Sequence, residues 1–310
     1  KQIIDSFLIS LVYPLKKREF VMDVIFHGVR GSTPTADQNF LKFGGSTTCT
    51  EILHEQFQVI FDAGTGFQNV TILKDRPTYL IFSHFHYDHI LLATQAGKHI
   101  FCEKPIDLSY EKVQTVKATI ESAGIHFMVG FNRRFDPHIQ ELKAAIDQGK
   151  AGSPRIVKIT SRDPSPPSLE FIKHSGGLFL DMAIHDFDMA RYRVGDEVVQ
   201  VSSTGNIFGD LPLAQFDDID TAVTTLIFKK GCMVQIDNSR YSSYGYDQRL
   251  EVFGQNGKVA TQNILENTVE TSDASGHHTA RSKLFFIERY ADSYRNILMD
   301  FVATLKNKQA

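Results

Sequence analysis

Residues 90–149 alternate between helical and extended patterns, and this alternation limits the possible folds more than any other feature of the sequence. The segments are a helix over 90–96, a strand over 99–102, a helix over 109–124, a strand over 125–131 and a helix over 136–149. Ser109 and Asp136 are typical N-caps of the two longer helices. Gly124 and Gly149 fall where these helices would end. Strands that alternate with helices in this way predict a parallel sheet.

Residues 150–310 contain longer extended runs and fewer helical ones. Extended runs cover 155–162, 198–208, 221–228, 233–241 and 249–254, and helical patterns cover 178–193 and 290–305. Lys229, Lys230 and Gly231 make a typical hairpin turn between two of these runs, which predicts antiparallel pairing. We therefore expect a mostly antiparallel α+β domain after the parallel segment.

The first ninety residues are β-rich. Short runs with β-branched residues cover 21–26, 48–53, 58–61 and 78–83. Residues 1–21 indicate an extension: the apolar run over 7–15 is shorter than the ~20 residues of a membrane-spanning helix. Its positive charges also follow the run, whereas those of a signal peptide precede it. The expected segments are an extension (1–21), a β-rich segment (22–89), a parallel-sheet domain (90–150) and an α+β domain (151–310).

Charge and cysteine content exclude several classes of partner. The chain has 33 basic and 36 acidic side chains, a net charge of −3, and no basic block. Nucleic acid and anionic membrane are therefore not expected as partners. The three cysteines are far apart in the sequence, which argues against a disulfide framework and for a reducing compartment. We expect a cytoplasmic protein.

The first cluster of candidate functional residues follows the strand over 99–102. Glu103 and Lys104 come directly after this strand, and Pro105 stiffens the turn. Ligands of open α/β sheets bind at the carboxyl ends of the strands, so this position favours a functional lysine. The alternative is an ordinary solvated lysine after a strand, which residue type alone favours.

The second cluster lies in the helix expected over 178–193. Asp181 and His185 are four residues apart, so they share one face of that helix. A carboxylate beside an imidazole fixes its tautomer and raises its basicity, which suits a general base near neutral pH. A surface ion pair is the alternative, and from spacing alone it is the more common arrangement.

Together these motifs resemble the glucose–fructose oxidoreductase/inositol dehydrogenase (GFO/IDH/MocA) family. The resemblance covers residues 90–310 and includes Glu103-Lys104-Pro105, Gly130-Phe131-Asn132-Arg133-Arg134-Phe135 and the Asp-x-x-x-His helix. It is most similar to inositol 2-dehydrogenases at Ile236-Asp237-Asn238-Ser239-Arg240 and Tyr244-Gly245-Tyr246-Asp247-Gln248-Arg249. The resemblance implies a partial Rossmann-like, dinucleotide-binding domain over 90–150 and a substrate and oligomerisation domain over 151–310.

The resemblance also implies roles for individual residues in an NAD- or NADP-dependent oxidation of a polyol or sugar. His185 would be the base, Lys104 would hold the substrate oxygen and Asp181 would orient the base. Cofactor contacts would come from Glu103, Lys104, Pro105, Asn132 and Arg133, and substrate contacts from Arg134, Asp163, Tyr241 and Tyr246. A homo-oligomer is implied as well.

The amino-terminal part departs from this family. Dinucleotide-binding domains carry G-x-G-x-x-G after their first strand, where the glycines let the backbone approach the pyrophosphate. Gly28 and Gly31 follow a strand, but Pro34 and the extended runs after it are not the helix that this motif needs. Gly64 and Gly66 are followed by a short β-branched run. We therefore find no phosphate-binding loop, which makes the activity of the chain uncertain.

Residues 22–89 instead resemble the metallo-β-lactamase superfamily. The resemblance is carried by the runs 28–34, 43–49 and 61–66 and by His84-x-His86-x-Asp88-His89. Four ligand-type side chains directly after a strand favour a zinc site, which the resemblance would divide between two metal ions. The later ligands of that superfamily are absent. A zinc-dependent, phosphodiesterase-like hydrolase and an inactive fusion, or chimera, thus remain as alternatives to the dehydrogenase.

Overall fold

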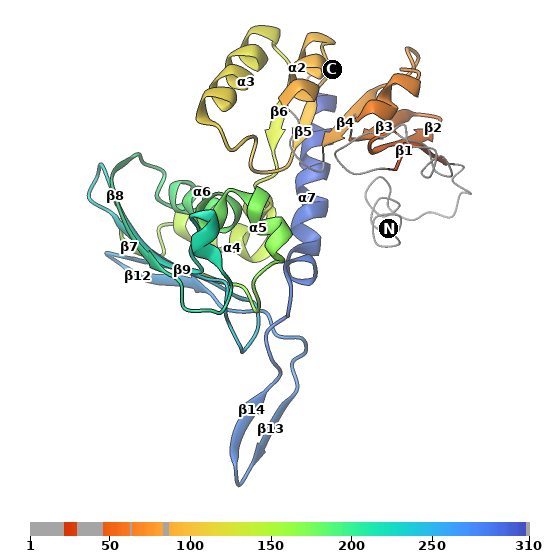
Figure 1. The fold of residues 1–310 in the computed structure, drawn as a ribbon. Helices are drawn as coiled ribbons and strands as arrows, with labels where there is room; N and C mark the ends of the chain where they lie inside the picture. The colour runs from red at the N-terminus through yellow and green to blue at the C-terminus, as the bar shows by residue number, and fades with distance from the viewer. Residues whose placement is uncertain (1–21, 30–45, 63, 83–86, 308–310) are drawn as a thin grey trace. The chain divides into compact units, whose positions relative to one another are not determined.

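The computed structural model describes residues 22–29, 46–62, 64–82 and 87–307, in two compact units. Unit 1 comprises residues 1–130 and 298–310, and unit 2 comprises residues 131–297. Figure 1 labels the elements of both units. Within the described ranges, every helix is too short or too polar to cross a lipid bilayer.

Unit 1 contains a six-stranded sheet with the strand order β1-β2-β3-β4-β5-β6. The strands are β1 (Asp23–Gly28), β2 (Cys49–His54), β3 (Phe57–Phe61), β4 (Thr78–Phe82), β5 (Ile100–Cys102) and β6 (Phe127–Val129). The first three strands pair antiparallel, and β3 to β6 pair parallel. The expected boundary at residue 89 therefore falls inside one sheet, because β4 and β5 are direct neighbours.

Two helices and their apolar side chains build the core of unit 1. Helix α2 (Tyr87–Gln95) connects β4 with β5, and helix α3 (Tyr110–Ala123) connects β5 with β6. Ile90 of α2 and Val116 of α3 pack against strand residues such as Leu80. Ser109 caps α3, and Gly124 ends it in the left-handed conformation, as the sequence predicts. A short 3-10 turn, η2 (Thr65–Asn69), follows β3.

Unit 2 contains a second six-stranded sheet, in the order β12-β11-β7-β10-β9-β8. The strands are β7 (Pro154–Arg162), β8 (Val198–Asn206), β9 (Thr221–Phe228), β10 (Met233–Ser239), β11 (Asp247–Gly254) and β12 (Gly257–Thr261). Only the β7–β10 pair is parallel, so the expected, mostly antiparallel domain is confirmed. A two-stranded hairpin, β13 (Glu270–Asp273) with β14 (Gly276–Thr279), extends from the body of this unit (Figure 1).

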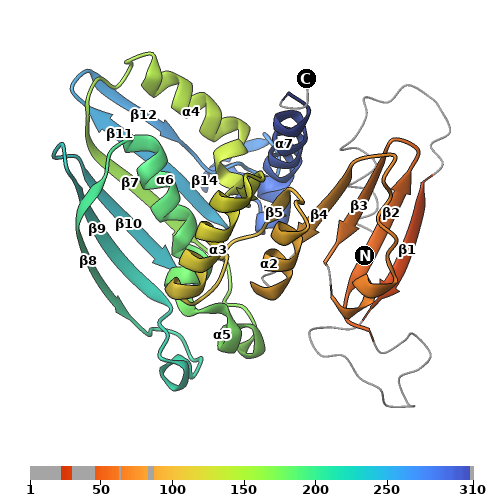
Figure 2. The same cartoon turned by 90° about the horizontal axis from the view of Figure 1, so that it is seen from above.

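Helices cover one face of the second sheet (Figure 2). They are α4 (Pro137–Asp147) and α6 (Ile184–Val194), and the unit also contains η3 (Asn132–Phe135), α5 (Leu169–Ser175), η4 (Phe179–Ala183) and η5 (Leu213–Phe216). Alternate strand residues such as Val157, Val234 and Val252 are fully buried against Ile139 of α4 and Met189 of α6. Helix α7 (Phe286–Asn307) starts in unit 2 and ends in unit 1.

The structure differs from the sequence-based expectation in several elements. The helix expected over 178–193 is divided into a π-helical turn, η4, and the α-helix α6. Helix α5 was not predicted because its seven residues are too few to show a helical period. The hairpin strands β13 and β14 are fully exposed and polar, so they lack the alternation that marks a half-buried strand.

Candidate active site

The sequence-predicted lysine follows the shortest strands of unit 1. Strand β5 ends at Cys102, whose carbonyl accepts a hydrogen bond of 2.7 Å from the Gly130 amide after β6. The Glu103 amide donates to the Phe82 carbonyl of β4, at 3.4 Å. Glu103 and Lys104 therefore lie where the carboxyl ends of β4, β5 and β6 meet, and the Lys104–Pro105 peptide bond is cis.

Glu103 is partly buried at this edge of the sheet, next to Gly130. A Cβ atom on Gly130 would lie 2.7 Å from the Glu103 carboxyl group, so a larger residue there would displace this side chain. Burial raises the pKa of Glu103 to about 7, although the Lys104 amide and charge oppose the rise. A carboxyl group that titrates near neutrality is common in functional sites.

Asp181 and His185 lie in unit 2, on η4 and on the first turn of α6. The Asp181 carboxylate accepts a hydrogen bond of 3.1 Å from the Arg240 guanidinium, which is fully buried. The His185 ring makes an edge-on contact with Phe131, at 6.3 Å between ring centroids. The π-helical turn changes the spacing that an uninterrupted α-helix would give, and turns of this kind are frequent at functional sites.

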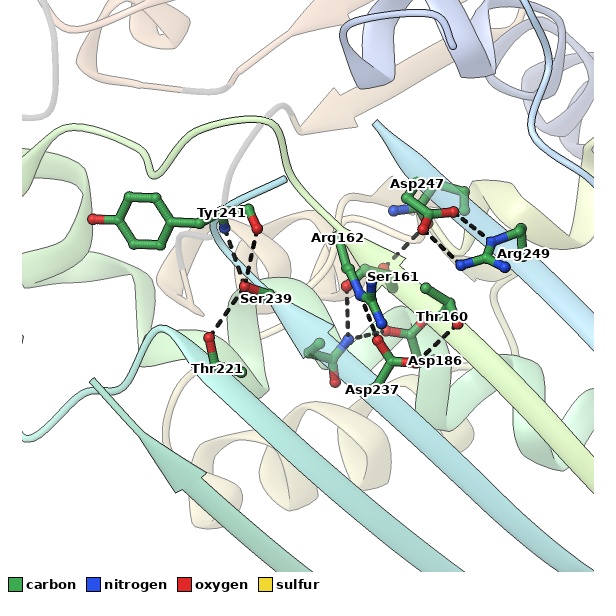
Figure 3. A network of polar contacts seen from close by, with 12 residues as sticks. Thr160, Ser161, Arg162, Asp186, Thr221, Asp237, Ser239, Tyr241, Asp247 and Arg249 are labelled. Atoms are coloured by element: carbon green, nitrogen blue, oxygen red, sulfur yellow. Dashed lines mark hydrogen bonds and ion pairs between the residues drawn. The ribbon is translucent and has the colours of Figure 1, made fainter. Parts of the chain in front are cut away.

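A buried ion pair fixes the helix that carries His185. Asp186 is fully buried, and its carboxylate accepts hydrogen bonds from Arg133 at 2.6 Å and from Asn238 at 2.7 Å. Arg133 also donates to the Ser161 hydroxyl at 3.3 Å, and Figure 3 shows Ser161 beside Asp186. Burial raises the pKa of Asp186, and Arg133 and Asn238 oppose this effect. Buried hydrogen bonds thereby link the start of α6 to the strands β7 and β10.

Asp163 extends the cluster of charges around Asp181. It follows β7, and its amide donates to the Ser239 carbonyl at 2.9 Å. Burial raises the pKa of Asp163 to about 6. Arg133 and Arg240 oppose this rise, and Asp181 adds to it, which places Asp163 within electrostatic reach of the candidate catalytic carboxylate.

The other sequence-predicted contacts have partners inside unit 2. Arg134 forms an ion pair with Asp188 at 2.5 Å and stacks over Tyr192 at 4.8 Å. Tyr246 is buried and meets Tyr290 edge-on, at 6.1 Å between ring centroids. These contacts account for both side chains structurally, so their predicted role in binding a polyol stays a prediction.

Three further sequence-predicted residues are also placed. Asn132 is buried and donates to the Ser293 hydroxyl at 3.3 Å. Its neighbour Arg133 is equally enclosed by its ion pair with Asp186, so neither side chain presents a free polar group to the surface. Tyr241 is partly exposed, and its ring covers Gly209, where a Cβ atom would clash at 2.2 Å. Their predicted cofactor and substrate contacts are untested.

The predicted zinc ligands are only partly within the described residues. His84 and His86 lie outside them. Asp88 and His89 belong to the first turn of α2, and their side chains are likewise outside the description. The residues that are described contain no group of three or more His, Cys, Asp or Glu side chains placed to hold a metal ion.

The chain matches two sequence profiles of one oxidoreductase family. Residues 139–260 match the GFO/IDH/MocA C-terminal domain, and residues 71–131 match the NAD-binding Rossmann fold of the family. The inositol 2-dehydrogenase of Rhizobium meliloti is 43% identical over 221 residues, which are 71% of this chain and 67% of that protein. The chain belongs to the GFO/IDH/MocA family.

Other members of the family are similarly close. The uncharacterized oxidoreductase YrbE of Bacillus subtilis is 46% identical over 224 residues, and the myo-inositol 2-dehydrogenase of Thermotoga maritima is 45% identical over 222 residues. The chain covers 66% of the length of each, and 72% of the chain is aligned.

Solved structures of the family share the fold. A probable dehydrogenase from Thermotoga maritima superposes with a TM-score of 0.72 at 40% identity, covering 76% of this chain and 75% of that one. The scyllo-inositol dehydrogenase of Lactobacillus casei, solved with NAD(H) and scyllo-inositol, has a TM-score of 0.67 at 28% identity and covers 75% of each chain. These relatives give no support to the metallo-β-lactamase resemblance of residues 22–89.

Family membership allows a direct test of how well the described residues suit a dinucleotide. The parallel strands β4, β5 and β6 and their helices match the family's NAD-binding fold, and their carboxyl ends carry Glu103 and Lys104. The described glycines that follow strands in unit 1 are already used in packing. A Cβ atom on Gly28 would lie 2.0 Å from the Thr47 carbonyl oxygen, and one on Gly66 would lie 2.7 Å from the His27 backbone. The described part thus places Glu103 and Lys104 at the strand ends, where ligands of such sheets bind, and shows no glycine loop open to a pyrophosphate.

Sequence reasoning missed Arg240 and Asp218. Both are buried, and Arg240 lies 3.8 Å from Asp218 as well as contacting Asp181. Arg240 follows β10, in which every second residue is buried: Val234, Ile236 and Asn238. Residue 240 continues this alternation, so the sequence could have predicted that Arg240 is buried. A buried arginine is rare without acidic partners, and no local pattern reveals partners 22 and 59 positions away in sequence.

Proposed function

We propose that the protein is an NAD(P)-dependent oxidoreductase of the inositol 2-dehydrogenase type, which oxidises a hydroxyl of a polyol or sugar to a ketone. The observation that most supports this proposal is the position of Asp181. It lies on a π-helical turn, contacts the buried Arg240, and comes directly before the helix that starts with Ile184 and His185. This placement gives the Asp-x-x-x-His pair a defined local structure, which a solvated surface pair would not need. NAD(H) and scyllo-inositol are bound in a relative that shares the fold.

The proposed chemistry assigns one task to each functional side chain of the motifs. His185 accepts the proton of the reacting hydroxyl, because a neutral imidazole is a suitable base near pH 7. Asp181 orients His185, and Lys104 stabilises the negative charge that develops on the substrate oxygen. A nicotinamide, when bound, accepts the hydride. Asp163 is the best supported of the predicted substrate contacts, since its carboxyl group interacts with the charges of Asp181 and Arg240.

The experiment measures cofactor binding and turnover separately. NADH fluorescence is titrated with the protein, and NADH formation is followed with NAD and myo-inositol. We expect wild-type turnover, with kcat lowered about 10²- to 10⁴-fold in His185→Gln because the proton loses its acceptor. His174→Gln is the matched control, since His174 is an exposed histidine of α5 that only approaches Glu170.

The alternatives make different predictions in the same assays. An inactive fusion gives neither a fluorescence change up to millimolar NADH nor turnover, and this result would refute the proposal. A zinc-dependent hydrolase gives stoichiometric zinc and phosphodiester cleavage that is lost in His86→Ala. The proposal requires turnover of a polyol with no dependence on His86.

We also propose that the protein is a homo-oligomer that covers the open face of the second sheet. The helices cover only the opposite face (Figure 2). On the open face, Ile227, Met233, Ile156 and Phe253 are paired in register across four strands and form an apolar row. Arg162 and Thr160 each donate a hydrogen bond to Asp237 on the same face (Figure 3). Analytical ultracentrifugation at micromolar concentration tests this; a monomer at every concentration contradicts it.

A further inference from the structure

Arg240 occupies a fully buried position between two carboxylates. Its Nη1 atom donates to the Asp181 Oδ2 atom at 3.1 Å, and its Nη2 atom lies 3.8 Å from the Asp218 Oδ2 atom. Its amide donates to the Asp220 carbonyl at 2.8 Å, which fixes the backbone from which the side chain starts. Asp218 is 4% exposed and Asp181 is 18% exposed, so the guanidinium links an interior carboxylate to one near the surface.

Asp218 connects this arginine to the start of the π-helical turn. The Asp218 Oδ1 atom accepts a hydrogen bond of 2.8 Å from the Leu178 amide. A Cβ atom on Gly177 would lie 2.7 Å from the same oxygen, and Gly177 has a φ of 77°, so a larger residue is excluded on two grounds. Arg240 therefore meets both ends of the segment 178–181: it donates a hydrogen bond to Asp181 itself, and at 3.8 Å it faces the charge of Asp218, which accepts from the Leu178 amide.

This arrangement gives the Asp181 carboxylate an anchor outside its own helix. A π-helical turn has weaker local restraints than an α-helix, so the direction of a side chain on it depends on tertiary contacts. The planar, multiply donating guanidinium suits a bridge between two carboxylates, whereas a lysine amine is a single point of charge on a flexible chain. Within the described residues, the Arg240 Nε and Nη2 atoms have no hydrogen-bond acceptor, so one strong bond, to Asp181, orients the group.

We propose that Arg240 is a positioning residue, which sets the orientation of the Asp181 carboxylate through its bridge to Asp218. This inference rests on the proposed function for the role of Asp181, and it adds the residue pair that makes that role possible. Arg240 itself is enclosed and acts only through Asp181.

The experiment compares Arg240→Lys with Arg193→Lys. Arg193 is also a buried arginine of unit 2, but it stacks over Tyr192 at 4.3 Å and has no contact with Asp181. Crystal structures of both variants show whether the Asp181 carboxylate keeps its orientation. Kinetics with NAD and myo-inositol then give kcat and KM. We expect Asp181 to rotate in Arg240→Lys only, with kcat lowered about 10- to 100-fold and KM changed less than about twofold.

The variant Asp218→Asn and the wild type distinguish a failure of this inference from a failure of folding or of the proposed function. Asp218→Asn retains an acceptor for the Leu178 amide while removing the charge that faces Arg240, so we expect a smaller, roughly threefold loss of kcat. It replaces Arg240→Lys if that variant does not fold. An unmoved Asp181, or an unchanged kcat in an active enzyme, overturns the inference. If the wild type has no turnover, the proposed function fails, and the orientation of Asp181 in the variant structures still decides the inference.

Discussion

The two units hold their sheets together in different ways. In unit 2, four neighbouring strands of seven to nine residues pair over seven or eight positions, and their alternate residues contribute to one apolar core. In unit 1, the parallel part is short: β5 and β6 have three residues each, and β3 and β4 have five each. Both sheets bury apolar residues against helices, α4 and α6 in unit 2 and α2 and α3 in unit 1, but the strands of unit 2 are longer.

The family matches cover the two units differently. The C-terminal domain match, 139–260, lies entirely within unit 2. The match to the NAD-binding fold starts at residue 71, so β1, β2 and β3 precede it. Strand β3 nevertheless pairs parallel with β4, and it is followed outward by antiparallel strands. The edge of a sheet has unpaired backbone N–H and C=O groups, with which strands of many sequences can pair. In unit 1, β3 pairs with these groups of β4.

The largest expected effect comes from breaking the buried ion pair of unit 2. In Arg133→Met, the fully buried Asp186 carboxylate loses its charged partner, and we expect the free energy of unfolding to fall by about 3–5 kcal/mol. Urea denaturation followed by circular dichroism measures this change. The adjacent Arg134 is the control: its side chain is 41% exposed and that of its partner Asp188 is 8% exposed, so Arg134→Met should cost less than Arg133→Met, whose pair is buried on both sides.

A double variant separates charge from packing in this prediction. Arg133→Met with Asp186→Leu removes both charges, and most of the lost stability should return, because the cost lies in an unpaired buried carboxylate. Equal losses in the single and the double variant would instead assign the effect to lost packing around Tyr290, over whose ring Arg133 lies at 5.5 Å.

The sequence predicted local features of both units well. Some features depend only on residues that are neighbours in the sequence, and the structure confirms them: the caps of α3 and α4, the turn after β9 and the short parallel strands. Pairing between distant segments was less accessible. Strand β4 pairs parallel with β3 on one side and with β5 on the other. The sequence motifs assigned β3 and β4 to one resemblance and β5 to another, and no local pattern states which strands become neighbours.

The candidate site shows the same division. Lys104, Asp181 and His185 were found because they stand in compact motifs, and their roles remain predictions. The residues that we propose to orient Asp181, Arg240 and Asp218, come from segments far away in sequence. Their function depends on burial and on a 3.1 Å contact, both of which are properties of the folded chain. Sequence patterns locate chemical groups, and tertiary packing decides how they point.

The second prediction concerns the buried carboxyl group of unit 1. The pKa of Glu103 is raised to about 7, so the folded state keeps its proton at pH values where the unfolded chain has lost it. Its contribution to stability is therefore fully present below about pH 4.5 and is lost as the pH rises through 7. The free energy of unfolding should fall by up to about 3 kcal/mol over this window, and Glu103→Gln should remove this dependence.

Asp163 provides the comparison within unit 2. Its pKa is raised to about 6, so its contribution is lost over a lower and narrower range, from about pH 4 to 6. Urea denaturation at intervals between pH 4 and 8 measures both effects, with Asp163→Asn as the matched variant. If Glu103→Gln leaves the pH dependence of the wild type unchanged, burial of the Glu103 carboxyl group is not its source.

The smallest expected effect lies on the same helix as the largest one. At the far end of α6, Arg191 forms an ion pair with Glu197 at 3.0 Å, and the two side chains are 60% and 72% exposed. Solvent and salt screen such a pair, so Glu197→Gln should change the free energy of unfolding by less than about 1 kcal/mol, and by less still in 0.5 M NaCl. Urea denaturation at both salt concentrations measures this change. A loss as large as that of Arg133→Met would show that this exposed pair contributes as much to stability as the buried Asp186 pair, which contradicts the prediction.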